Sequence, residues 1–325
     1  MPDPPVGPGQ VRIAVKAAGI NFADTLARIG MYPDAPRLPC VVGYEVAGEV
    51  ESVGDGVESP AVGDRVIGAT RFNGYAELVT VPARQAFPLP ESLSFEGGAA
   101  FPINYGTAYA ALIIMGGLRE GDRVLIHAAA GGVGTSATQI ASGVGAEIFG
   151  TASASKHDAI REQGVAHAID YRNQDFAAEV MRITDGEGVD VIMDALGPTS
   201  FRKDYRILRP GGRLIMYGAS EVQSGSGTRD IPRALRSLAR MPGATMPWWK
   251  SLGVMNENKG VFGLNMLHWW DREGDIDRLI EPLIAGLEKG ELKPVVAEAF
   301  PFDHAPDAHR MIEERRNIGK VVLVP

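Results

Sequence analysis

The sequence predicts an α/β protein in which a β-rich domain accompanies a six-stranded, doubly wound cofactor domain. Residues 11–90 alternate short apolar strands with turns rich in Pro and Gly, which is typical of a β-barrel-like domain. From about residue 104, strands alternate with helical stretches, which indicates a parallel sheet. The length of 325 residues also exceeds what one ordinary core supports. We therefore expect a catalytic domain at 1–103 and 267–325, and a cofactor domain at 104–266.

The apolar periodicity places the individual elements. In the first domain we expect strands at 11–15, 46–50, 63–67 and 76–81. In the second we expect strands at 123–127, 147–152, 167–170, 189–195, 212–218 and 260–264, with helices at 134–143, 156–163 and 176–183. The tail has helices at 276–289 and 305–316 and strands at 295–300 and 319–323, and is expected to fold back onto the first domain. The uncharged stretch 97–118 contains Pro102, Asn104 and Thr107, so it predicts a buried helix at the domain junction rather than a membrane span.

Composition excludes several classes of protein. Apolar residues make up 45% and charged residues 22%, which is ordinary for a globular chain, and the net charge of −8 disfavours general nucleic-acid binding. The one cysteine, Cys40, forms neither an internal disulfide nor a thiolate zinc cluster, and is expected to be a small buried residue. Met1–Gly9 has no apolar signal-peptide core, so we expect a cytoplasmic protein. Strand alternation begins at once, at Val11, and we expect that a short preceding segment is missing.

A glycine turn after the strand at 123–127 carries the main functional signal. Gly131 and Gly132 would let a pyrophosphate approach the backbone, and Gly134 would let the following helix pack closely on the strand. Ala129 replaces the usual first glycine, so the motif is a variant of G-x-G-x-x-G. We predict that Ala129, Gly131, Gly132, Val133 and Gly134 bind a dinucleotide. The alternative is a purely structural glycine turn.

The end of the next strand indicates which dinucleotide is bound. NAD sites usually have an acidic residue there, whereas this chain has Thr151, Ser153, Ser155 and Lys156. Hydroxyls and a cation suit the 2′-phosphate of NADPH, which a carboxylate would repel. Lys156 could instead be a solvated residue of the first helical turn. Leu196, Tyr217 and Gly218 follow later strands and should face the cofactor, unless their loops are ordinary turns.

These segments resemble the medium-chain dehydrogenase/reductase superfamily over nearly the whole chain. The matching segments are 18–24, 43–48, 63–66, 74–77 and 128–134. Within the superfamily the chain is similar to the quinone oxidoreductases, and above all to their vesicle amine transport protein-like branch, through residues 150–157 and 317–325. The resemblance implies a GroES-like first domain, a Rossmann second domain and a homodimer that pairs through residues 260–264.

The resemblance also implies particular site residues. Zinc alcohol dehydrogenases of the superfamily have a cysteine ligand where this chain has Asn21 and a histidine ligand where it has Tyr44, so no metal is expected. Asn21 and Tyr32 would line the substrate cleft as catalytic residues, although Tyr32 could equally be a packed loop aromatic. Asn21 would bind either a substrate carbonyl or the nicotinamide ribose region. A tyrosine of some relatives is Leu26 here, which leaves the substrate's shape open. Further cofactor contacts are implied at Thr107, Tyr171, Phe262, Leu264 and Asn317.

The expected activity is zinc-independent hydride transfer from NADPH to a quinone or an α,β-unsaturated carbonyl. One rival is an enoyl-thioester reductase. Another is a non-catalytic lipid-binding protein that NADPH regulates, because Arg233, Arg236 and Arg240 share one face of a helix in 229–250 and Trp248 and Trp249 follow them. That segment could equally be an ordinary surface helix, and peripheral membrane contact stays open.

Overall fold

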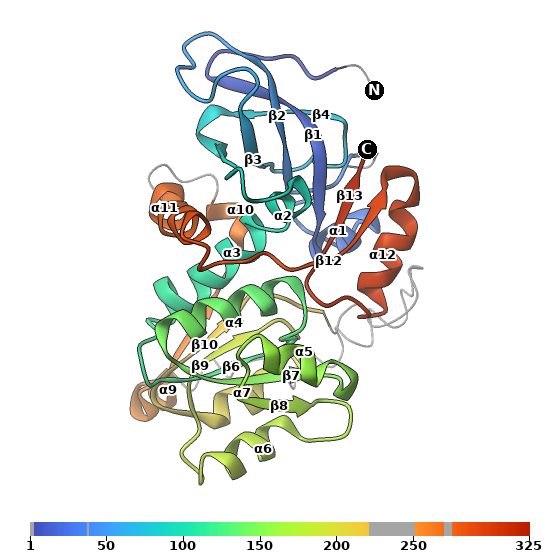
Figure 1. Cartoon of the computed structure of the whole chain (residues 1–325). Coiled ribbons are helices and arrows are strands. Elements are labelled where there is room, and N and C mark those ends of the chain that lie inside the picture. Colours follow the sequence, from blue (N-terminus) through green and yellow to red (C-terminus); the bar gives the residue numbers. More distant parts are fainter. Residues whose placement is uncertain (1–2, 38, 221–250, 270–274) are drawn as a thin grey trace. The chain divides into compact units, whose positions relative to one another are not determined.

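The chain folds into two compact units in the computed structural model (Figure 1). The structure describes residues 3–37, 39–220, 251–269 and 275–325. One unit comprises Met1–Gly106 and Met266–Pro325, and the other comprises Thr107–Asn265. The basic segment 229–250, which includes Trp248 and Trp249, lies outside the described residues.

The first unit is built on a seven-stranded sheet around β1 (Gln10–Ile20). The sheet order is β12-β13-β1-β2-β3-β5, and β4 also pairs with β1. The other strands are β2 (Glu45–Val53), β3 (Arg65–Ala69), β4 (Leu78–Pro82), β5 (Ala86–Pro88), β12 (Val296–Pro301) and β13 (Lys320–Val324). Because β13 pairs antiparallel with β1, the tail returns to the first unit, as the sequence predicted. The core holds the inward residues of β1, namely Val11, Ile13 and Val15.

The first unit also contains five helices in its described residues. They are α1 (Phe22–Arg28), α2 (Phe95–Ala99), α10 (Met266–Trp269), α11 (Asp275–Glu288) and α12 (Ala305–Glu313). Ala308 of α12 joins the sheet core, so α12 packs against the sheet with its apolar face. Short 3-10 turns at Ala83–Gln85 and Phe302–His304 complete the unit.

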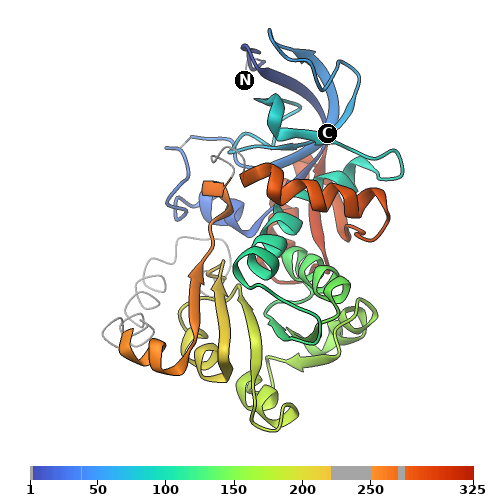
Figure 2. The same cartoon turned by 90° about the vertical axis from the view of Figure 1, so that its left-hand side faces the viewer.

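The second unit contains the predicted doubly wound parallel sheet. Its strand order is β11-β10-β9-β6-β7-β8, with β11 at one edge (Figure 2). The strands are β6 (Arg123–Ile126), β7 (Glu147–Ala152), β8 (His167–Asp170), β9 (Val189–Asp194), β10 (Leu208–Met216) and β11 (Gly260–Gly263). The connecting helices are α4 (Gly132–Val144), α5 (His157–Glu162), α6 (Phe176–Ile183), α7 (Phe201–Ile207) and α9 (Ser251–Glu257), with a 3-10 turn at Ala154–Lys156. Phe176 and Val180 of α6 pack on Leu125, Phe149 and Ile192 of the sheet.

The stretch 97–118 is more divided than the single buried helix that we expected. After α2, a new helix α3 (Pro102–Tyr109) begins at Pro102, because proline lacks the N–H that has no helical partner at this position anyway. It continues as a π-helix (Ala110–Met115), in which Ile114 is 42% exposed. No helix in the described ranges is long and apolar enough to cross a bilayer.

Two smaller expectations were wrong. Cys40 is half-buried instead of buried, because it lies in a loop outside the sheet core. Strand β10 starts at Leu208 rather than at Gly212, because Leu208 already pairs with Val189 before the register shifts.

Candidate cofactor and substrate sites

The predicted glycine turn connects β6 to α4 in the second unit. Gly131 precedes α4 in an extended conformation, with φ −76° and ψ 173°, and no side chain caps the helix N-terminus. The partial positive charge and N–H groups of this thirteen-residue helix therefore suit an anionic group such as a pyrophosphate. Ala128, with φ 53°, adopts the left-handed conformation in this turn, although glycine is the usual residue for it.

Two glycines allow main-chain segments to touch around this turn. A Cβ on Gly134 would lie 2.3 Å from the carbonyl oxygen of Ala128, so only glycine lets α4 pack on the turn. A Cβ on Gly218 would lie 2.7 Å from the carbonyl oxygen of Ala195, beyond the ends of β9 and β10. Gly131 is less restricted, since its Cβ would lie 3.3 Å from the Ala128 oxygen. The close packing of the helix that was predicted at Gly134 is thus present, while the approach of a pyrophosphate to Gly131 and Gly132 stays a prediction.

Hydroxyls and cations lie at the carboxyl ends of β7 and β8. The Ser153 and Ser155 hydroxyl oxygens are 3.3 Å apart. Lys156 is half-buried. Its pKa is lowered mainly by this burial and, to a lesser extent, by the nearby charge of Arg172. The Arg172 guanidinium also lies 6.0 Å from the ring centre of Tyr171. Sequence reasoning missed Arg172, although its place directly after Tyr171 could have suggested it. Two cations and two hydroxyls suit a phosphate dianion.

Thr151 also has a structural part in the glycine turn. Its hydroxyl oxygen accepts a hydrogen bond from the Ala128 N–H at 3.2 Å and lies 3.1 Å from Nδ1 of His127. The Ala129 N–H also donates to the Thr151 carbonyl at 3.0 Å. Thr151 therefore holds the glycine turn against β7, and these bonds fix the left-handed Ala128.

A buried cluster below the turn was not predicted. His127, Asp194 and Asp204 are fully buried, and His127 Nε2 lies 2.9 Å from Asp204 Oδ1. Asp194 accepts hydrogen bonds from the N–H groups of Leu196 and Gly197 and from the Ser200 hydroxyl. Burial raises the pKa of Asp194 to about 7, against the opposing charge of His127. The cluster joins the glycine turn to the loop that follows β9.

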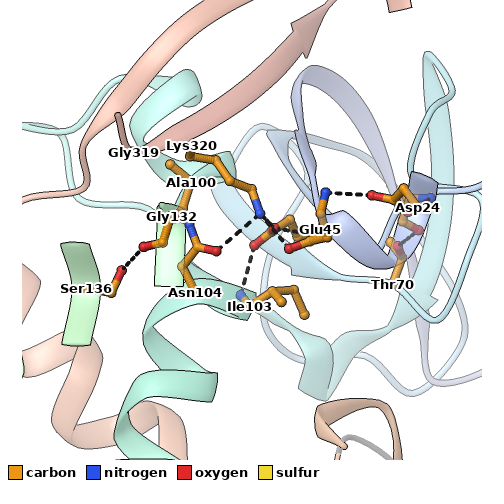
Figure 3. A network of polar contacts seen from close by, with 12 residues as sticks. Asp24, Glu45, Thr70, Ala100, Ile103, Asn104, Gly132, Ser136, Gly319 and Lys320 are labelled. Carbon is orange, nitrogen blue, oxygen red and sulfur yellow. Dashed lines mark hydrogen bonds and ion pairs between the residues drawn. The ribbon is translucent and has the colours of Figure 1, made fainter. Parts of the chain in front are cut away.

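In the first unit, Asn21 belongs to a polar cluster with Lys320. Figure 3 shows Lys320 beside Glu45 and Asn104 in this cluster. The Lys320 ammonium donates to Asn21 Oδ1 at 2.7 Å and to Asn104 Oδ1 at 3.4 Å, and forms an ion pair with Glu45. Asn21 Nδ2 donates to Glu45 Oε1 at 2.9 Å. The Ile103 N–H donates to Glu45 Oε2 at 2.8 Å. A charged residue at the start of a buried strand, Lys320, was the available sequence signal for this cluster.

A second buried series of hydrogen bonds supports the backbone of Asn21. Asp24 accepts hydrogen bonds from the N–H groups of Asn21 and Gly43 at 2.7 and 2.9 Å, and from the Tyr75 hydroxyl at 3.1 Å. The Tyr75 hydroxyl also lies 3.2 Å from His309 Nε2. Burial raises the pKa of Asp24 to about 7 and lowers that of His309 to about 4. The entry to α1 is therefore held by a carboxyl group that water does not reach.

Tyr32 packs in an aromatic group of the first unit. Its ring centre is 6.1 Å from that of Tyr44 in an edge arrangement, and Tyr44 is 5.0 Å from Phe72. Among the described contacts, the buried Tyr44 hydroxyl has no hydrogen-bond partner. Burial raises its pKa far above the ordinary value. Tyr44 is thus a packed aromatic here, and Tyr32 lies at the edge of the group.

The remaining predicted residues are distributed over both units. Thr107 is buried, Leu264 is buried, and Phe262 is 40% exposed on β11. Tyr217 is half-buried, and its N–H donates to the Asp194 carbonyl at 3.0 Å. Asn317 Nδ2 donates to the Gly319 carbonyl at 2.7 Å, directly before Lys320. Asn21, Tyr32 and Asn317 therefore belong to the first unit, and the glycine turn and the phosphate candidates belong to the second.

The donor set around Asn21 does not fit a zinc ion. Within the ranges that the structure describes, no three His, Cys, Asp or Glu side chains gather as a metal site. The amide of Asn21 and the carboxylate of Glu45 already face the Lys320 ammonium. A dication placed there would be repelled by this cation and would find neither thiolate nor imidazole.

Comparisons with known proteins agree with this architecture. Residues 7–91 match the family described as alcohol dehydrogenase GroES-like domain, and residues 163–323 match the one described as zinc-binding dehydrogenase. The chain is 41% identical to the synaptic vesicle membrane protein VAT-1 homolog of Rattus norvegicus over 99% of this chain and 78% of that protein. It also matches two solved structures over its full length. The quinone oxidoreductase of Escherichia coli complexed with NADPH is 30% identical, with a TM-score of 0.85 and 94% of its chain covered. CurK enoyl reductase is 31% identical, with a TM-score of 0.83 and 93% of its chain covered. The chain therefore belongs to the medium-chain dehydrogenase/reductase superfamily, where its relatives include VAT-1 homologues and its structural neighbours include quinone oxidoreductases.

Proposed function

We propose that this protein is an NADPH-dependent reductase of quinones or α,β-unsaturated carbonyls that works without zinc. The supporting observation is a polar group at the carboxyl ends of β7 and β8. Ser153, Ser155 and Lys156 follow β7 with no acid before Lys156, and the charge of Arg172, which follows β8, acts on Lys156. The first unit would be the catalytic domain and the second the cofactor domain. The boundaries 103/104 and 266/267 remain our proposal for that division.

The second unit has the features needed to hold the cofactor. The N-terminus of α4 would bind the pyrophosphate, while Ser153, Ser155 and Lys156 would bind the 2′-phosphate. Asp194 positions the loop of Leu196 and Gly197 through their N–H groups. NADPH, when bound, supplies a hydride from C4 of its nicotinamide.

The first unit would bind the acceptor. Asn21 is only partly buried and keeps one Nδ2 hydrogen beyond the one given to Glu45, so it can donate to a carbonyl oxygen. Tyr32, at the edge of the aromatic group, would lie against a flat acceptor. Quinones and enones accept a hydride without a Lewis acid, which fits a site whose cation is an ammonium group.

The test is oxidation of NADPH and of NADH, followed by absorbance, with ortho-quinones, para-quinones and enones in the presence and absence of a chelator. We expect fast turnover with NADPH and a quinone, slow turnover with NADH, and no effect of the chelator. Tight NADPH binding without turnover on any acceptor would sink the enzyme proposal.

The likeness to CurK enoyl reductase supports a second candidate, reduction of enoyl thioesters. Adding enoyl thioesters of increasing chain length to the same panel separates the two candidates. A rate that rises with acyl length and exceeds that with quinones would favour the thioester. The name of the VAT-1 relatives keeps membrane binding as a third candidate. Binding to anionic liposomes that disappears when Trp248 and Trp249 are replaced by alanine would support it.

A further inference from the structure

The polar cluster around Lys320 is assembled from four separate parts of the first unit. Asn21 follows β1, Glu45 opens β2, Asn104 lies in α3 and Lys320 opens β13. Lys320, Glu45 and Asn104 are 2%, 0% and 3% exposed, whereas Asn21 is partly exposed. Asn21 is therefore the member through which this buried cluster can reach a ligand.

The partners of Asn21 fix the orientation of its amide. The ammonium group of Lys320 only donates hydrogen bonds, and it faces the Asn21 oxygen at 2.7 Å. The carboxylate of Glu45 accepts a hydrogen bond from the Asn21 nitrogen at 2.9 Å. Turning the amide over would place NH₂ against the ammonium and oxygen against the carboxylate. The amide is thus held in one orientation with one N–H to spare.

The cluster satisfies its own charges completely. The ammonium has three acceptors, in Asn21, Asn104 and Glu45. Both oxygens of Glu45 are used, one by Asn21 and Lys320 and the other by the Ile103 N–H. Lys320 therefore has no hydrogen left to give to a substrate, and any influence on one must pass through Asn21.

A cation on an amide oxygen draws electron density from the nitrogen and strengthens its N–H groups as donors. We propose that Lys320, balanced by Glu45, is a positioning residue that orients and polarises Asn21 so that its spare N–H binds the acceptor's carbonyl oxygen. This inference rests on the proposed reductase function.

The spare N–H would act where charge develops. When a hydride adds to the β-carbon of an enone, a C–H bond forms and the C=C electron pair shifts toward the carbonyl oxygen. The resulting enolate then takes a proton from water, so the reduced product is neutral. A preorganised donor at that oxygen lowers the barrier most for weak acceptors. Their transition state is late, so it already carries much of the enolate's negative charge.

The experiment compares kcat/KM across enones of graded electrophilicity and one ortho-quinone. The neutral variant is Lys320→Met with Glu45→Gln, because either change alone leaves a buried charge unpaired. We expect about a tenfold loss for the weakest enone, mainly in kcat, and less than about threefold for the ortho-quinone. Lys320→Arg should restore most of the rate, and NADPH affinity should not change.

A cycle with Asn21→Leu shows whether Lys320 acts through Asn21. We expect Asn21→Leu to lose about 100-fold on the weakest enone, with no further loss when the neutral pair is added. An equal loss on every acceptor, or full additivity in the cycle, would overturn the proposal. If the neutral pair does not fold, an Asn21→Leu series whose rate losses do not depend on acceptor strength is sufficient to overturn it.

A readout without turnover separates this inference from the proposed function. The Asn21 side-chain amide, assigned in ¹⁵N NMR spectra by its loss in Asn21→Asp, should shift in Lys320→Arg and shift further in the neutral variant. An unmoved signal overturns the inference even in an active enzyme. If the signal shifts in the variants but the wild-type protein reduces no acceptor, the result supports the polarisation of Asn21 and overturns only the reductase function.

Discussion

Gly134 and Gly143 lie in the same helix, α4, but a methyl group meets different surroundings at each. At Gly134 the added Cβ would lie 2.7 Å from backbone atoms of Ala129 as well as against Ala128. At the exposed Gly143 it would meet nothing within 4 Å. The same substitution should therefore change stability in opposite directions at the two positions.

We expect Gly134→Ala to lower the free energy of unfolding by about 3 kcal/mol, because α4 must move off the turn. Dinucleotide affinity should fall with it, since the helix N-terminus moves too. Gly143→Ala is the matched control and should stabilise the protein by about 0.5–1 kcal/mol. Thermal melts with and without NADPH measure both effects. Unchanged NADPH binding in Gly134→Ala would mean that the turn does not hold the pyrophosphate.

Lys156 should distinguish NADPH from NADH. NADH lacks the 2′-phosphate, so it offers the half-buried Lys156 ammonium no phosphate to bind. Lys156→Ala is expected to weaken NADPH about 10- to 100-fold, the worth of a hydrogen bond between charged groups, and to leave NADH unchanged. Fluorescence titration with both cofactors measures this. Arg172→Ala should have the same sign, and equal weakening of both cofactors would place the phosphate elsewhere.

At the scale of elements, α1 and α12 are connected by buried groups that respond to pH in opposite directions. Asp24 has a folded-state pKa of about 7, above its ordinary value, so its contribution to stability is complete below about pH 4 and is lost as pH rises through 7. His309 has a folded-state pKa of about 4, below its ordinary value of 6.5. Its contribution is complete above pH 6.5 and is lost as pH falls toward 4.

His309→Gln should therefore remove the loss of stability that His309 causes as the pH falls. Relative to wild type, the variant should gain stability between pH 6.5 and 4, by at most about 3 kcal/mol, because each tenfold change in proton affinity corresponds to about 1.4 kcal/mol. Urea denaturation across this range measures the difference. His304→Gln, at the exposed start of α12, is the control and should change little. A constant offset between His309→Gln and wild type at every pH would contradict this account.

Regular elements with local signals could be predicted well. β7, β8 and α6 have the bounds that their apolar periodicity indicates, because each lies between clear turn residues. The polar clusters could not be predicted in the same way. Asn21 and Lys320 lie 299 residues apart, and nothing near either residue in the sequence specifies the other. His127 and Asp204 become partners only when β6 and α7 meet, so the sequence showed an isolated histidine there.

At the scale of the whole molecule, the edge strand β11 bears on assembly. Residues 261–263 lie at the edge of the parallel sheet, and Phe262 is 40% exposed. An edge strand that carries an exposed aromatic favours pairing with a second copy. The predicted homodimer through 260–264 therefore stays our proposal.

Phe262→Glu tests this assembly. Two copies of the new carboxylate would meet across a two-fold axis, so sedimentation velocity should show a shift from dimer to monomer. NADPH affinity, measured in parallel, reports whether Phe262 also contacts the cofactor, as the family resemblance implies. Met255→Glu, an equally apolar and even more exposed position on α9, is the control. A dimer that persists in Phe262→Glu would place the interface elsewhere.

The pairing of β1 with β13 has a consequence for the order in which the protein is made. The second unit is continuous from Thr107 to Asn265, so it can fold on the ribosome while later residues are still being added. The first unit cannot, since β1 has to wait for β13 and Asn21 has to wait for Lys320. A nascent chain that stalls before residue 320 could thus already bind NADPH yet lack the cation beside Asn21. During synthesis, the second unit, which we propose to bind the cofactor, would therefore fold before the first unit, which we propose to bind the acceptor.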